Sequence, residues 1–159
     1  MHCTKIKITV LVLLSISTML IAADTPQVTG KYLGNNKEAK LGYAIAVLID
    51  DWQGEPAYQI VLTEKDPSKV AKPEFDAIFG KLGHALLVKV TKSGKIFGSE
   101  ICHQDLKRSG VSQVGVLNIE KFKIEGNTIS GRFFTNGPVK IFDETWEADL
   151  TIAAPIKTK

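Results

Sequence analysis

The sequence predicts an all-β domain in which about eight short strands form a two-sheet β-sandwich with one short helix. Two observations indicate this fold. Most segments between residues 28 and 153 are short apolar or alternating runs, and turn residues separate them at hairpin spacing. Only the stretch around residue 75 has helical spacing instead. A closed up-and-down β-barrel made from the same strands is the alternative architecture.

The first strands include a predicted hairpin. Residues 28–33 are a short strand candidate, and residues 42–49 (GYAIAVLI) are almost continuously apolar, as is typical of a strand covered on both faces. A polar loop, residues 50–56, separates this run from residues 57–64, in which apolar and polar side chains alternate. Because the loop is short, we expect the two longer runs to pair as a β-hairpin.

A short helix is predicted after residue 72. Pro73 suits the first helical position, and acidic residues stand in the first turn. Phe75, Ile78 and Phe79 follow at i, i+3 and i+4 spacing, which gives the helix one apolar face. Gly80 can end the helix. We expect the apolar face to pack against one end of the β core.

The remainder of the chain returns to strands. The candidates, most of them bounded by Gly, Asn or Ser turn residues, are 85–91, 95–103, 115–124, 128–135, 139–142 and 145–153. Residues 106–112 are a polar, basic loop. The apolar phase shifts within the third of these strands, which predicts a β-bulge near Glu120 and Lys121.

Residues 1–23 have the layout of a secretory signal peptide. Two lysines precede an apolar run over residues 8–23, and small residues end that run. The run has 16 residues, fewer than the roughly 20 that span a bilayer. We therefore expect cleavage, a secreted or periplasmic location, and one soluble β-sandwich domain over residues 24–159 without a stable transmembrane segment. An uncleaved N-terminal anchor is the alternative.

Charge and cysteine content exclude some classes of function. Without residues 1–23 the chain has 18 Lys+Arg against 17 Asp+Glu, a net charge of +1, and no basic stripe. Nucleic-acid binding is therefore not expected. Cys102 is the single cysteine after residue 23, so no internal disulfide can form and the fold must depend on its core.

The stretch Ile101 to Asp105 (ICHQD) raises the question of a catalytic or metal site. Strand alternation places Cys102 and His103 on opposite faces, although a thiolate–imidazole pair needs hydrogen-bond contact. No catalytic sequence motif is found, so we predict a protein that is not an enzyme and has no cofactor. The candidate metal ligands are His84, Cys102 and His103, should the fold bring them together.

Two loops are candidate ligand-binding sites. Trp52 could stack on the face of a sugar ligand beside Asp50 and Asp51. Lys107 and Arg108 form a small basic loop that could bind an anion. Their simpler interpretation is a tryptophan folded over the edge of the core and two solvated charges.

Three functions are consistent with these observations. The favoured one is an exported, non-catalytic binding or interaction module for an unidentified protein or small-molecule ligand, bound through loops at one end. The second is a metal-binding protein or enzyme that uses the two histidines and the cysteine. The third is a carrier of an apolar ligand inside a barrel, for which the candidate lining residues are Tyr43, Ile45, Tyr58, Phe133 and Phe134.

Overall fold

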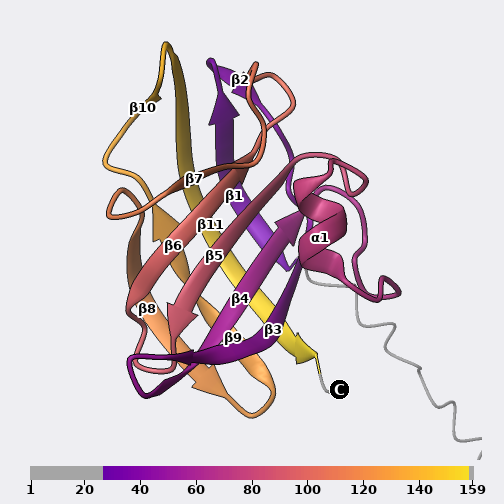
Figure 1. The fold of residues 1–159 in the computed structure, drawn as a ribbon, viewed down its shortest axis with the longest axis vertical. Coiled ribbons are helices and arrows are strands. Elements are labelled where there is room, and N and C mark those ends of the chain that lie inside the picture. The colour runs from indigo at the N-terminus through magenta and orange to yellow at the C-terminus, as the bar shows by residue number, and fades with distance from the viewer. Residues whose placement is uncertain (1–26, 158–159) are drawn as a thin grey trace, which may run out of the picture.

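The computed structural model describes residues 27–157, and the predicted signal peptide lies outside the described residues. The chain is nearly all β, and its strands form one curled, open sheet with the shape of half a barrel (Figure 1). The elements are β1 (Val28–Gly34), β2 (Lys37–Glu38), β3 (Tyr43–Trp52), β4 (Glu55–Thr63), α1 (Pro73–Ile78), β5 (Ala85–Thr91), β6 (Ile96–Cys102), β7 (Val111–Gln113), β8 (Asn118–Glu125), β9 (Thr128–Phe134), β10 (Val139–Ile141) and β11 (Glu144–Lys157). No helix in this part of the chain is long and apolar enough to cross a membrane.

Strand β11 joins the two halves of the sheet. It has 14 residues, of which 144–155 pair antiparallel with β1, β9 and β10, and β8 pairs with β9. Its last residues, Ile156 and Lys157, pair in parallel with Ala46 and Val47 of β3, which begins the meander β3–β4–β5–β6–β7. The predicted two-sheet sandwich is therefore not confirmed, because one long strand belongs to both halves. A closed barrel is not seen either, since no ladder joins β8 to β6 or β7 among residues 27–157.

Several local predictions are confirmed. Strands β3 and β4 form the expected hairpin. The expected bulge lies in β8, where the pairing with β9 shifts register between Glu120 and Lys123 and Lys121 has a φ of 52°. Strands β2 and β7 were not predicted, and β7 begins inside the segment interpreted as a polar loop. They have two and three residues, too few for alternation to indicate a strand.

The main hydrophobic core fills the inner side of the curled sheet. Strand β11 contributes a row of alternate buried side chains, as its sequence pattern predicts: Trp146, Ala148, Leu150, Ile152 and Ala154. Trp146, Tyr32 and Phe133 are the largest fully buried side chains. The indole Nε1 of Trp146 donates a hydrogen bond to Oε1 of Gln113 over 2.6 Å, which ties β11 to β7 across the core.

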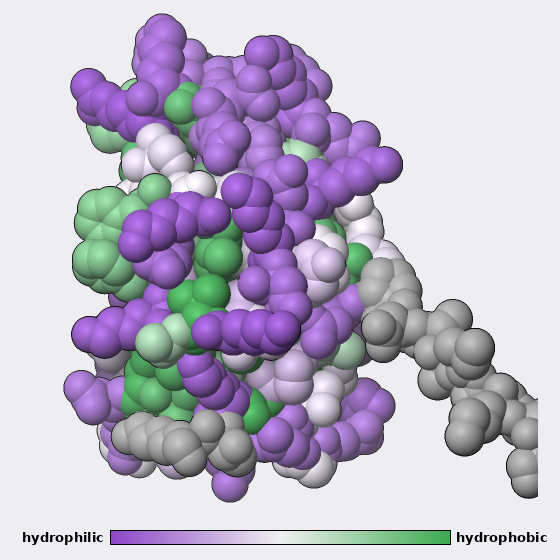
Figure 2. Space-filling model, turned by 90° about the vertical axis from the view of Figure 1, so that its right-hand side faces the viewer, coloured by the Kyte–Doolittle hydropathy of each residue, from purple (hydrophilic) through white to green (hydrophobic). Residues whose placement is uncertain are grey.

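Helix α1 packs on the outer side of the sheet, against β4, β5 and β6, and not at an end of the core as expected. Ala77 is buried there with a second apolar cluster, and Ile78 packs against it. Phe75 and Phe79, predicted to face the core, are exposed and pack on each other with ring centroids 4.5 Å apart. Figure 2 faces this side of the molecule and shows apolar groups among hydrophilic ones. The helix has six residues, so its spacing alone did not fix which side is buried.

Candidate metal centre

His103 follows the last residue of β6 and points to the inner side of the sheet. Its ring is fully buried and lies 5.0 Å from the ring of Tyr32, centroid to centroid. Nδ1 accepts the backbone N–H of Asp105 over 3.2 Å, whereas Nε2 is buried and has no partner among the described residues. Because Nδ1 of the neutral ring accepts this bond, Nε2 carries the ring proton, and a buried donor without a partner costs about 1–3 kcal/mol.

His84 lies beside His103, just before β5. The two ring centroids are 4.5 Å apart and the rings meet edge to face. Nδ1 of His84 accepts the backbone N–H of Gln104 over 3.2 Å, and the backbone N–H of His84 donates to Glu64 Oε2. The pairing of Ala85 with Cys102 in the β5–β6 ladder brings the two histidines together, because each is the next residue beyond that pair.

Asp105 completes a cluster of three possible ligands. Its Oδ2 lies 3.8 Å from His103 Nδ1, and one possible ligand atom from each of His84, His103 and Asp105 lies within 4.8 Å of the others. Its other oxygen, Oδ1, accepts a hydrogen bond from Lys37 Nζ over 2.8 Å. We call these three residues the His–His–Asp cluster. Two imidazoles and a carboxylate are ligands that zinc and neighbouring divalent metals use in proteins.

The loop that carries Asp105 is fixed to the sheet. The Asn35 side chain donates to the backbone oxygen of Asp105 over 3.1 Å and to Glu144 Oε1 over 2.8 Å. Both oxygens of Glu144 accept the backbone N–H of Lys107. Leu106 is buried in the main core. The cluster is therefore built on an anchored loop, which favours a defined arrangement of its side chains.

The surroundings of His103 and Asp105 determine the ionisation states of these two side chains at neutral pH. Burial lowers the pKa of His103 to about 4, with a further decrease from His84, and nearby Asp105 opposes this shift. The hydrogen bond from Lys37 lowers the pKa of Asp105 below its ordinary value. His103 is therefore a neutral imidazole and Asp105 an ionised carboxylate, which are the forms that bind metal ions.

Gly34 supplies the space that His103 occupies. A Cβ at this position would come within 2.9 Å of His103 Cε1 and closer still to Nδ1 and Cγ. We expect Gly34→Ala to lower the free energy of unfolding by about 1–3 kcal/mol, because the added methyl group overpacks a buried site. Urea unfolding followed by circular dichroism measures this change. Gly42→Ala is the matched control, since a Cβ at Gly42 meets no atom within 4 Å, and equal effects of the two substitutions would contradict the contact.

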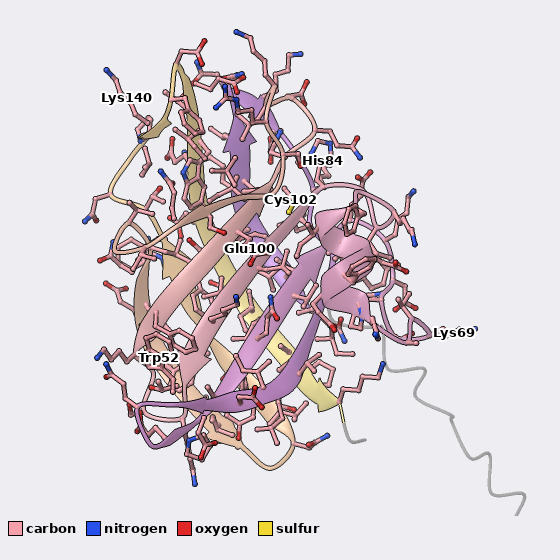
Figure 3. All side chains as sticks on the ribbon, in the orientation of Figure 1. Trp52, Lys69, His84, Glu100, Cys102 and Lys140 are labelled. Atoms are coloured by element: carbon pink, nitrogen blue, oxygen red, sulfur yellow. The ribbon has the colours of Figure 1, made fainter. Side chains whose placement is uncertain are left out.

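The structure does not bring Cys102 to the two histidines. Its thiol lies in the cluster beneath α1, on the opposite side of β6 from His103, as strand alternation predicts. Figure 3 shows Cys102 and His84 at the end of the sheet near α1. Burial, and then the charge of Glu100, raise the pKa of Cys102 to about 11. The thiol is therefore a small buried apolar group in this setting.

We expect alkylation of Cys102 in the native protein at pH 8 to be at least about a hundredfold slower than in urea, because the buried thiol is protonated. Peptide mass spectrometry after timed iodoacetamide treatment measures the rate and separates Cys102 from Cys3. Equal rates in the native and unfolded chain would show that the thiol is accessible.

The loop candidates lie in two different places. Asp50 and Asp51 are exposed at the end of β3, and Trp52 stacks on Phe97 with parallel rings 4.4 Å apart. Trp52 is 41% exposed, so part of its surface remains open to solvent. Trp52 and His84 lie at opposite ends of the curled sheet (Figure 3). A ligand on Trp52 would therefore not contact the His–His–Asp cluster.

The two basic candidates have partners within the chain. Lys107 Nζ pairs with Asp143 Oδ2 at 3.2 Å. The Arg108 guanidinium lies over the Phe142 ring, 4.4 Å from its centroid. The Lys107–Asp143 pair is highly exposed, so these contacts do not decide whether the loop binds an anion.

The candidate lining residues of an apolar cavity do not share one space. Phe133 is buried in the main core and Tyr58 packs against it, whereas Ile45 belongs to the cluster beneath α1. Tyr43 is exposed, and Phe134 carries the Arg132 guanidinium over its ring. The five residues thus lie on both sides of the sheet.

Sequence reasoning identified His84 and His103 but missed Asp105 and Lys37 as parts of this site. The nearby signal for Asp105 was its position two residues after His103, where a turn can return a side chain toward the ring. Lys37 gave no signal, because the two-residue strand that carries it has no recognisable pattern.

Comparisons with protein-family models, with curated proteins and with solved structures find no match for this chain. The proposed function therefore rests on the geometry and chemistry of the His–His–Asp cluster.

Proposed function

We propose that this protein is a metal-binding protein that holds a divalent transition-metal ion, such as Zn²⁺, on His84, His103 and Asp105. One observation carries the proposal: a fully buried histidine, a second histidine and a carboxylate each offer a ligand atom within 4.8 Å of the others.

The choice of ligands supports this class of metal. Mg²⁺ and Ca²⁺ prefer sites made of oxygen atoms alone, whereas two imidazoles and one carboxylate suit Zn²⁺, Ni²⁺, Co²⁺ or Cu²⁺. Three protein ligands leave one position of a tetrahedral ion for water or an outside donor. His84 is only partly buried, which gives an ion a route from solvent. Cys102 lies on the other side of β6, so we assign its thiol no part in the site.

The test is equilibrium binding of Zn²⁺ to the full-length chain, measured by competition with a chromophoric chelator. We expect His84→Ala to weaken binding by at least about a hundredfold, because even loss of an outer-shell partner typically costs about 10- to 100-fold. Circular dichroism checks that this partly exposed substitution leaves the fold intact.

Asp143→Asn is the matched control. Asp143 is an exposed carboxylate close in sequence to Glu144, which anchors the cluster's loop, but it is outside the cluster. We expect Asp143→Asn to bind Zn²⁺ as the unsubstituted chain does. Equal affinity of the unsubstituted chain and His84→Ala, or no binding by the unsubstituted chain, would contradict the proposal.

A further inference from the structure

The geometry points to Lys37 as a built-in competitor of the metal: its ammonium group holds the Asp105 carboxylate in the metal-free protein and lowers the affinity of the His–His–Asp cluster. This inference rests on the proposed function and concerns the regulation of the same site.

Lys37 lies where its side chain can reach the cluster. Lys37 stands on β2, a two-residue edge strand that pairs Lys37 with Gly34, the glycine packed against His103. Its ammonium group contacts Asp105 Oδ1 at 2.8 Å and is otherwise largely exposed. The side chain thus reaches the cluster from outside, while His84 and His103 approach from the ends of β5 and β6.

Lys37 and a bound metal ion would share the Asp105 carboxylate. Oδ1 of Asp105 faces Lys37, whereas Oδ2 faces His103 Nδ1 at 3.8 Å. A metal ion on Oδ2 would leave the ammonium group on the other oxygen, so the two cations would lie about 5 Å apart. Each cation also withdraws charge from the one carboxylate that both need. Metal binding must therefore overcome a repulsion that the fold already contains.

The expected loss of metal affinity follows from the charges of the two cations. Repulsion between a double and a single positive charge at this distance, in the high dielectric of a surface site, corresponds to about a tenfold loss of affinity. Replacement of Lys37 by Met keeps a chain of similar length and removes the charge. We expect Lys37→Met to bind Zn²⁺ about tenfold more tightly than the unsubstituted chain. Lys37→Arg keeps the charge and should bind within about twofold of it.

A second lysine offers a closely matched control. Lys81 pairs with Asp76 at the same distance of 2.8 Å, with side-chain exposures of 63% and 26% against 69% and 30% for Lys37 and Asp105. Asp76 is outside the cluster. Lys81→Met removes the same charge from the chain and should leave Zn²⁺ affinity within about twofold of the original.

The experiment measures Zn²⁺ affinity of the full-length chain and the three lysine variants by chelator competition at fixed ionic strength. A gain for Lys37→Met alone supports the competitor. Unchanged or weaker binding by Lys37→Met, or an equal gain for Lys81→Met, overturns it while the metal site itself stands. Absence of Zn²⁺ binding by every chain overturns the proposed function and the competitor together.

Discussion

Replacement of Trp146 by alanine should lower the free energy of unfolding by about 3–5 kcal/mol, the usual cost of removing a large aromatic side chain from a core. Trp146 is 1% exposed and belongs to β11, the strand that joins both halves of the sheet. The substitution leaves a cavity and also removes the hydrogen-bond donor of Gln113 Oε1. The loss should therefore loosen β7 as well as β11.

Urea unfolding followed by circular dichroism measures the effect, since fluorescence would change with the number of tryptophans. Trp52→Ala is the matched control. Trp52 is 41% exposed and contacts Phe97 through one ring face, so we expect a loss of no more than about 1.5 kcal/mol. Equal losses for the two variants would show that Trp146 is not a central part of the core.

Acidification from pH 7 to pH 4 should remove about 3 kcal/mol of stability from the metal-free protein through His103 alone. The folded state holds the pKa of His103 at about 4, chiefly because the ring is buried and next because His84 lies beside it. In the unfolded chain a histidine titrates near 6.5. Between these values the unfolded state binds a proton that the folded state does not. Stability therefore falls as the pH drops through this window, and His103 adds little further loss below it.

The groups around His103 set this window. His84 faces the ring from the end of β5, Asp105 from the following loop, and Lys37 from β2. Asp105 opposes the shift but does not cancel it. Carboxylates whose pKa is lowered, such as Glu144, lose their contribution at lower pH, below their ordinary pKa. The two effects therefore occupy different parts of the pH scale.

The measurement is the free energy of urea unfolding at several pH values between 4 and 7, with a chelator present. His103→Gln removes the ionisable ring and should flatten the profile between pH 6.5 and 4.5, whatever its stability at pH 7. Identical slopes in His103→Gln and the unsubstituted chain would show that this histidine is not the source of the acid sensitivity.

Sequence patterns predicted the local elements of the fold better than their arrangement. Alternation along β4 and β11 and the turn residues between strands indicated most of the ladder partners that lie close in sequence. The parallel contact of Lys157 with Val47 joins strands about a hundred residues apart, and no local pattern records it. That contact decides between two separate sheets and one curled sheet. The position of α1 was missed because a six-residue helix carries too little periodicity to define its buried face.

The candidate site was predictable only in part. Alternation along β6 separates Cys102 from His103, and the structure places them on opposite sides of the sheet. The approach of His84 depends on the register of β5 against β6, which a hairpin signal suggests but does not fix. Asp105 enters through a turn, and Lys37 through a strand too short to recognise. Residues brought in by irregular backbone leave no periodic trace in a sequence.

X-ray absorption at the zinc edge of the Zn²⁺-loaded full-length protein tests the proposed metal centre most directly. We predict a first shell of nitrogen and oxygen atoms at about 2.0–2.2 Å, with imidazole scattering from His84 and His103 and no sulfur. A sulfur at about 2.3 Å would show that a cysteine thiolate ligates the ion and that the His–His–Asp cluster is not the site. A spectrum identical to that of hydrated Zn²⁺ would show that the protein holds no ion there.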